Sequence, residues 1–268
     1  MAYLTSSHLR LRNILHRFSV RIPSLVVNLL ITSFFCISLP LSAWATVGAS
    51  RSYDAVNDEV DWGANVDVTT NDVSYCTWVK PTEDDSSDYW IGKGSSSGGG
   101  TGYGLLTMIT TDASRCGVGD GTTNQAATGN DIDGVWTFVC CVWDSTNDDL
   151  FLYENNTNVA SDTADTLGSI TTTSSLQSGE TNGNSDDASG LVAYASIFLS
   201  KQLTAVEMAE IYWKPEGMVD SLSFMAPLQA TATTEPDWSA GKLGGTVSGS
   251  DTGSNDGPPV LFGLGLPL

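Results

Sequence analysis

The segment Val135–Asp144, VWTFVCCVWD, carries apolar side chains at nearly every position. Successive side chains of a β-strand point to opposite faces, so this segment divides into two sets. The first set is Trp136, Phe138, Cys140 and Val142, and the second is Thr137, Val139, Cys141 and Trp143. Because both sets are apolar, we predict a central strand that is covered on both faces.

Most other periodic segments of the chain also alternate with a period of two, and stretches rich in Gly, Asn, Asp, Ser and Thr separate them. This pattern predicts an all-β fold, a two-sheet antiparallel sandwich. Asn155-Asn156 favours a hairpin turn within LFLYENNTNVA, because Asn tolerates turn conformations. The predicted strands are Arg51–Val56, Val73–Lys80, Tyr89–Lys93, Gly102–Thr111, Val135–Trp143, Leu150–Glu154 and Leu191–Leu199.

One helix is predicted, at Thr204–Trp213. Thr204 and Glu207 have the spacing of a capping box, in which each side chain bonds the backbone N–H of the other residue. The side chains expected to form its apolar side are Leu203, Val206, Ala209 and Tyr212. We therefore expect a short helix that lies on a sheet edge.

The first 45 residues have the layout of an export signal. Four arginines and no acid precede the apolar run Leu25–Leu41, and the Ala-Trp-Ala sequence at 43–45 is a small-x-small pattern that signal peptidases accept. A membrane anchor is the alternative, because the apolar segment is about long enough to span a bilayer. Pro40 and the Ala-Trp-Ala end favour cleavage, so we assign residues 1–45 to a signal peptide and expect a membrane partner only if this segment is uncleaved.

The composition excludes several kinds of site. The formal charge is −20, and loss of a leader with four arginines and no acid would move it to −24, so nucleic-acid binding is disfavoured. The two histidines, His8 and His16, both lie in the leader. A chain without the leader has no imidazole for Ser-His-Asp or Cys-His catalysis or for a histidine-ligated zinc.

Four cysteines follow the leader: Cys76, Cys116, Cys140 and Cys141. An exported chain meets an oxidising compartment, which favours one or two disulfides, although buried free thiols remain the alternative. Cys140 and Cys141 would point to opposite faces of a strand, so we expect that they do not pair with each other.

Five segments, in order, resemble the laminin-G-like and pentraxin-like jelly rolls of the concanavalin-A-like superfamily. They are Ser52–Gly63, Val73–Pro81, Asp133–Asp144, Asp149–Ser161 and Gly190–Trp213. The third is similar to a D-G-x-W-H-x-V strand, with Thr137 where His is common, and the fourth resembles an L-x-L-Y-x-N-G hairpin. The resemblance implies a two-sheet jelly roll that binds glycans or proteins, often with calcium and usually without catalysis.

The same resemblance sets the expected domain limits. Phe224–Gly249, with Asp-Trp-Ser-Ala-Gly at 237–241, also resembles a strand found in some members, so the jelly roll is assigned to residues 46–249. Residues 250–268 combine a Gly/Ser/Asp-rich stretch with an apolar end broken by Pro and Gly, and we predict a flexible linker and tail there.

Glu59 and Asp61, in the stretch DEVDWG, raise the question of a glycoside hydrolase. They would share one face of a short strand, as in the Glu-x-Asp-x-x-Glu or Glu-x-Asp-x-Glu motif of laminarinase-type relatives in the same superfamily. Retaining hydrolysis needs a second functional carboxyl group about 5–5.5 Å away. The positions where the third acid should stand hold Gly63 and Ala64, so the motif is broken. We therefore predict a non-catalytic edge strand, whose acids discourage aggregation.

Calcium is the ion that the composition favours, because hard oxygen ligands are abundant. Pentraxin-like members carry ligands in a loop before the closing strand and in a loop after an early strand. By that resemblance the candidate ligands are Asp85 and Asp88 in PTEDDSSD, with Glu180, Asn182, Asp186 and Asp187 in GETNGNSDDASG. The alternative is that both loops are solvated turns of an acidic protein.

Three tryptophans near predicted strand ends, Trp62, Trp90 and Trp143, are candidates for stacking on sugar rings, with core packing as the alternative. Together these features predict a secreted or cell-surface module without enzymatic activity. Its expected partner is a glycan, with possible assistance by calcium. The alternatives are a protein-binding adhesion or structural protein, whose partner is a cell-surface protein, and a divergent laminarinase-type hydrolase.

Overall fold

The structure is a computed structural model of the whole chain. It describes residues 49–69, 71–82, 87–94, 100–108, 111–163, 165–180, 187–215, 218, 221–229, 233–249, 252–254 and 256–260. The predicted signal peptide lies outside these residues. Among the helices that can be described, none is both long and apolar enough to cross a bilayer.

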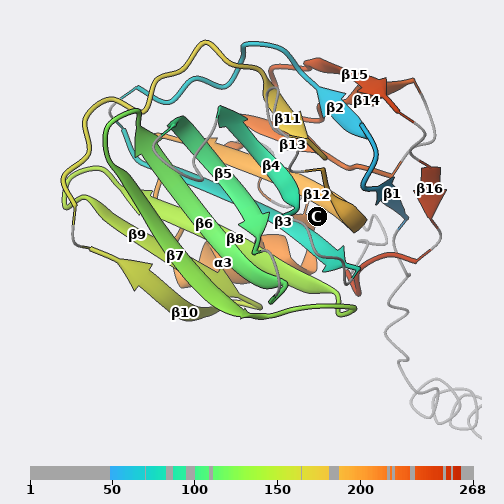
Figure 1. Cartoon of the computed structure of the whole chain (residues 1–268), viewed down its shortest axis with the longest axis horizontal. Helices are drawn as coiled ribbons and strands as arrows, with labels where there is room; N and C mark the ends of the chain where they lie inside the picture. The colour runs from blue at the N-terminus through green and yellow to red at the C-terminus, as the bar shows by residue number, and fades with distance from the viewer. Residues whose placement is uncertain are drawn as a thin grey trace, which may run out of the picture. The chain divides into compact units, whose positions relative to one another are not determined.

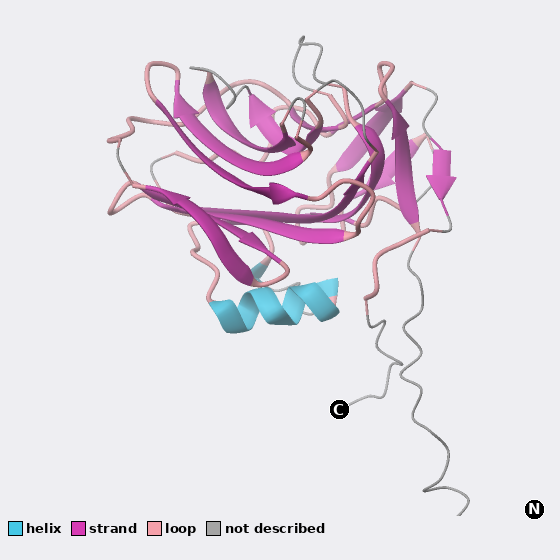
Figure 2. Ribbon diagram, turned by 60° about the horizontal axis from the view of Figure 1, so that its bottom comes forward, coloured by secondary structure: helices cyan, strands magenta, loops and turns pink. Residues whose placement is uncertain are grey.

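Two antiparallel sheets pack face to face, which confirms the predicted all-β sandwich (Figures 1 and 2). In the described residues, sheet A has the order β10 (Thr157–Asp162), β9 (Asp149–Glu154), β8 (Thr137–Asp144), β3 (Val73–Pro81), β12 (Ser189–Leu199), β1 (Ser50–Asp54) and β16 (Thr252–Ser254), and β13 (Phe224–Ala226) also pairs with β12. Sheet B has the order β14 (Thr234–Pro236), β15 (Gly244–Ser248), β2 (Glu59–Asp61), β11 (Leu176–Ser178), β4 (Tyr89–Gly94), β5 (Thr101–Thr107), β6 (Ala113–Asp120) and β7 (Asn124–Asp131).

Strand β8 is central, as its two apolar faces predict. It pairs with β3 on one side and β9 on the other, and all of its residues are buried. Val139, Cys141 and Trp143 face the main core between the sheets. Phe138 and Cys140 belong to a second apolar cluster, on the outer face of sheet A. The chain therefore buries both faces of this sheet.

Helix α3 (Ala205–Trp213) covers that outer cluster. Thr204 caps the N-terminus of the helix, and the predicted capping box with Glu207 is present. The predicted apolar side was partly wrong, because the helix buries Met208 and Ile211 while Val206 is 79% exposed. The helix also lies across the face of sheet A and not on its edge (Figure 2), with the Tyr212 ring centroid 4.8 Å from that of Trp78.

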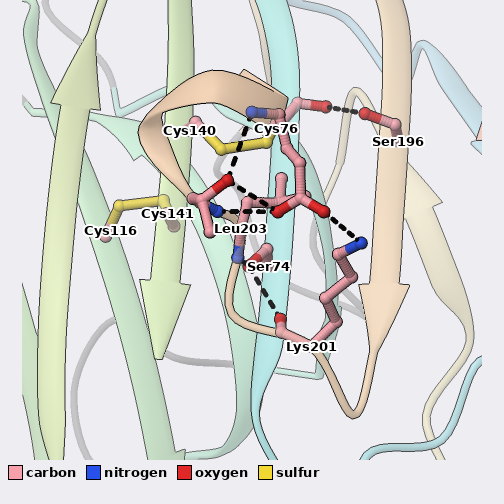
Figure 3. Close-up of a disulfide and its surroundings, with 10 residues drawn as sticks. Ser74, Cys76, Cys116, Cys140, Cys141, Ser196, Lys201 and Leu203 are labelled. Atoms are coloured by element: carbon pink, nitrogen blue, oxygen red, sulfur yellow. Dashed lines mark hydrogen bonds and ion pairs between the residues drawn. A yellow bond between two sulfur atoms is a disulfide. The ribbon is translucent and has the colours of Figure 1, made fainter. Parts of the chain in front are cut away.

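Both faces of β8 also carry a disulfide, and the predicted separation of Cys140 from Cys141 is confirmed (Figure 3). Cys140 bonds Cys76 on the neighbouring strand β3, beneath helix α3. Cys141 bonds Cys116 on β6 and so joins sheet A covalently to sheet B through the core. The sequence left the pairing open, because only the packing of the sheets decides which cysteines meet.

The C-terminal segment corrects two predictions. Strand β15 pairs with β2, so Glu59–Asp61 has a neighbour on each side and is not an edge strand. Strand β16 pairs with β1, and Val260 is fully buried in the outer cluster. The predicted linker and tail at 250–268 is therefore wrong for its described residues. The edge of β1 needs hydrogen-bond partners, and this short polar segment supplies them.

A buried ion pair fixes the same segment to the start of the domain. The Arg51 guanidinium, on β1, donates to Glu235 on β14 over 2.8 Å, and both side chains have no exposed surface. The other carboxylate oxygen of Glu235 accepts the Leu228 N–H at 2.7 Å. The contact ties the C-terminal strands to the fold.

Gly245 on β15 allows that strand to lie directly on Trp62. A methyl group built at this position would stand 2.5 Å from the indole Nε1 and 2.7 Å from Val60. Because neither the rigid ring nor the buried Val60 can move aside easily, we expect Gly245→Ala to lower the free energy of unfolding by about 1–3 kcal/mol, the usual cost of overpacking. Chemical denaturation measured by far-UV circular dichroism would test this.

The neighbouring Gly244 provides a matched control. A methyl group there would meet only Thr234, at an ordinary contact distance of 3.7 Å. Gly244→Ala should therefore leave stability unchanged to within about 1 kcal/mol. Equal effects of the two substitutions would show that Gly245 is not needed for the approach of β15 to Trp62.

Candidate functional site

Three of the predicted calcium ligands lie around one group of loops. Asp88 precedes β4, Glu180 follows β11 and Asp187 precedes β12. Backbone hydrogen bonds hold the loops together, from Ala188 N–H to Gly179 C=O at 2.7 Å and from Gly179 N–H to Tyr89 C=O at 3.0 Å. Asp85, Asn182 and Asp186 lie outside the described residues.

Asp88 serves as a clamp between the two sheets. Its side chain is fully buried. One carboxylate oxygen accepts the Thr107 hydroxyl at 2.6 Å, and the other accepts the Ser189 N–H at 2.7 Å. Thr107 belongs to sheet B and Ser189 to sheet A. Asp88 therefore brings the two predicted calcium loops together, and both of its oxygens already hold structural contacts.

Glu180, Asp187 and Glu59 form an acidic group. Partial burial first, and then the negative charges of Asp187 and Glu59, hold the pKa of Glu180 above its ordinary value. Asp187 accepts the Asn57 N–H at 3.4 Å through Oδ2, while its buried Oδ1 has no hydrogen-bond partner in the described chain. Glu59 accepts a 2.7 Å bond from the Gln177 amide.

This acidic group does not by itself make a metal site. Within the described residues, no three acidic, histidine or cysteine side chains gather closely enough to hold an ion. The structure thus places Asp88, Glu180 and Asp187 around the same loops and adds Glu59, which we had considered only as a candidate catalytic residue.

Glu59 and Asp61 lie on the same face of β2, and Val60, between them in the sequence, is fully buried. Asp61 accepts the Gly63 N–H at 2.6 Å and so closes the turn after the strand. Since Glu59 is bonded to Gln177, both carboxylates of the broken hydrolase motif have structural partners.

The three tryptophans proposed as sugar platforms are core residues, and the prediction for them is wrong. Trp62, Trp90 and Trp143 are 3%, 0% and 2% exposed. The Trp62 ring packs edge-on against Phe224, with 5.0 Å between centroids, beneath strand β15. A tryptophan near a strand end is buried when another segment of the chain packs over it. The alternation of residues along a strand does not show which distant segment will do so.

Two other tryptophans in the described part of the chain are exposed. Trp213 at the end of α3 is 47% exposed, and Trp238 after β14 is 43% exposed. Trp238 borders a surface pocket of about 500 Å³, which is also lined by Thr234, Pro236, Asp237, Lys242, Leu243 and Gly244. From the sequence, this stretch indicates only the fold. The Asp-x-Ser spacing at 237–239, which is typical of a side-chain-closed turn, could have indicated an exposed Trp238.

Comparison with protein families gives one match. A laminin G model, described as the concanavalin A-like lectin/glucanases superfamily, matches residues 54–209. No curated protein matches the sequence significantly. The match ends before the Trp238 pocket.

Solved structures share the fold at low identity. A "putative carbohydrate binding protein" from Bacteroides ovatus is 14% identical, with a TM-score of 0.61 over 78% of this chain and 60% of that chain. The botulinum neurotoxin serotype G binding domain is 13% identical, with a TM-score of 0.51 over 64% of this chain and 44% of that one. A pentraxin from Limulus polyphemus is 12% identical, with a TM-score of 0.49 over 62% and 82%. The chain thus spans only about 60% of the length of the Bacteroides ovatus protein.

Proposed function

The chain belongs to the concanavalin A-like lectin/glucanases superfamily, and from this we propose that it is an exported, non-catalytic module that binds glycans with the help of calcium. The binding end is the group of loops that carries Glu180 and Asp187, together with Glu59 on β2. The observation that carries the proposal is the grouping of the Glu59, Glu180 and Asp187 carboxylates, with the buried Oδ1 of Asp187 unpartnered in the described chain. Burial first, and then the charges of Asp187 and Glu59, raise the pKa of Glu180, and a bound cation would relieve the repulsion between these carboxylates.

The remaining ligands would come from the loops on either side. Asn182 and Asp186 stand in the sequence between Glu180 and Asp187, and Asp85 stands three residues before Asp88. The unpartnered Oδ1 of Asp187 supplies a further oxygen. An ion held by these oxygens could in turn bind two hydroxyl groups of a sugar, which explains how an acidic loop could recognise a neutral glycan.

Two features support the absence of catalysis and the export of the chain. The hydrolase motif lacks its third carboxyl group, and its two acids are engaged by Gln177 and Gly63. Two disulfides among the four cysteines that follow the leader fit an oxidising compartment outside the cytosol. Secretion, with the protein acting extracellularly or at the cell surface, follows from the predicted signal peptide.

We expect the double variant Glu180→Gln/Asp187→Asn to bind calcium at least ~10-fold more weakly than the wild type, because it removes two charged ligands. Isothermal titration with CaCl₂ measures this. The affinity should also fall on acidification at a higher pH than for an ordinary Glu, since a proton on Glu180 competes with the ion and its pKa is raised.

A glycan array with calcium, and again with chelator, tests recognition itself. Calcium-dependent hits that the double variant loses support the proposal. The control variant Asp149→Asn changes an acid on β9 instead of in the loops, and it should keep both activities. Failure of the wild type to bind calcium would overturn the metal site, and release of sugar from laminarin that Glu59→Gln abolishes would overturn the non-catalytic assignment.

One observation favours protein binding as a second candidate. Val206 and Trp213 are both exposed and stand seven residues apart, on the same side of α3. A protein partner could cover this side. An empty glycan array, together with binding to a surface protein that Val206→Ser/Trp213→Ser abolishes, would select this function.

A further inference from the structure

The loop between β14 and β15 is built around one buried carboxylate, that of Asp237, which is 5% exposed. Its Oδ1 accepts the N–H groups of Met225 and Ser239, at 3.0 and 2.8 Å. Its Oδ2 accepts the Ser239 hydroxyl at 2.8 Å and the Leu243 N–H at 3.1 Å. Four bonds to one side chain fix the shape of the loop.

This loop holds Trp238 at the surface in a fixed position. The backbone N–H of Trp238 donates to the Met225 C=O at 2.7 Å, which ties the residue to β13 of sheet A. The side chain is nevertheless 43% exposed and borders the open surface pocket of about 500 Å³. An exposed indole on a rigid backbone can contact a ligand at little cost in conformational entropy.

The polar groups of the pocket select the chemistry of the ligand. Lys242 is exposed at the pocket and forms no ion pair with any residue that the structure describes. By contrast, Arg51, Lys80, Lys93 and Lys201 each pair with a carboxylate. Asp237 also lines the pocket, but its four internal donors occupy its oxygens. The pocket therefore offers a cationic donor and an aromatic face, which suit a ring that carries an anionic acceptor.

We propose that the Trp238 pocket is a second glycan subsite, which takes a single uronic acid residue of an otherwise neutral glycan, because the net charge of −20 disfavours a polyanion. The C–H face of the sugar ring stacks on Trp238, and its carboxylate pairs with Lys242. The inference rests on the proposed glycan-binding function and adds a contact that needs no calcium, on a loop outside the family match at 54–209.

The test uses full-length protein in EDTA and a galactose trimer that carries one terminal galacturonic acid as the probe, with the neutral galactose trimer for comparison. We expect the trimer with the carboxylate to bind more tightly than the neutral one, because only its carboxylate can pair with Lys242. Trp238→Ala should raise the Kd at least ~10-fold, as for an aromatic anchor. Lys242→Gln should raise it roughly 2- to 5-fold, as for one exposed ion pair, and should remove the preference over the neutral trimer.

Trp213→Ala and Lys214→Gln are matched controls, because both residues are exposed at the end of α3. They should leave the Kd unchanged, and an unchanged melting temperature of all four variants would show that the fold is intact. Equal binding of the two trimers, no binding in EDTA, or the same loss in Trp213→Ala would overturn the subsite. The proposed calcium-dependent function is tested separately, by Glu180→Gln/Asp187→Asn in calcium.

Discussion

Replacing Glu235 with Gln should lower the free energy of unfolding by about 3–5 kcal/mol, the cost of removing one partner of a fully buried ion pair. Glu235 faces Arg51 at 2.8 Å, with neither side chain exposed. The variant would leave the guanidinium in the interior without its carboxylate. Such a loss is a large part of the stability of a typical domain, so we expect urea to unfold the variant at a much lower concentration.

Two comparisons show whether the loss of stability in Glu235→Gln comes from the burial of the ion pair or from the loss of charge pairing alone. Lys80→Gln breaks the exposed pair with Asp256 and should cost only about 0–1 kcal/mol. The double variant Arg51→Met/Glu235→Met removes both buried charges and should be more stable than Glu235→Gln alone. If Glu235→Gln is as stable as Lys80→Gln, the pair does not anchor the C-terminal strands.

Removing the disulfide between the sheets should have an effect of similar size. Cys116 and Cys141 are 25 residues apart, and closing a loop of that length stabilises a fold by about 3.5 kcal/mol in the chain-entropy model. We therefore expect Cys116→Ala/Cys141→Ala to lose about that much, measured by urea denaturation under oxidising conditions.

The second disulfide tests the physical cause. Cys76 and Cys140 are 64 residues apart, so the same model gives about 4.3 kcal/mol for Cys76→Ala/Cys140→Ala. If the disulfides stabilise the fold mainly by reducing the entropy of the unfolded chain, Cys76→Ala/Cys140→Ala is the less stable of the two variants. This holds although Cys76 and Cys140 join strands that are already paired. A larger loss for Cys116→Ala/Cys141→Ala would instead show that the covalent link between sheets A and B matters through the folded state.

The candidate site was less predictable than the fold. Glu180 and Asp187 could be found because acids concentrate in one loop, and their contact with the loop of Asp88 follows from the superfamily resemblance. Trp62 was misassigned, because its cover comes from Gly245, more than 180 residues later in the chain. Trp238 was not predicted as a site residue. The exposure of a side chain depends on which distant segments pack against it, and the neighbouring sequence does not show these segments.

The strands that were not predicted have a common cause. β6 and β7 contain many Gly, Ala, Asn and Asp residues, and β11, β14 and β16 each have only three residues. Such segments have little preference for a strand by themselves. They become strands because a neighbouring strand offers unpaired N–H and C=O groups.

Four features could be predicted from the sequence, because each depends on the alternation or spacing of neighbouring residues. They are the all-β class, the central position of β8, the capping box of α3 and the separation of Cys140 from Cys141. Four others could not be predicted: which cysteines pair, that β15 covers β2 and Trp62, that Glu235 meets Arg51, and that Trp238 is exposed. These contacts join residues far apart in the chain, and their energies come from burial and pairing that exist only after the sheets have packed.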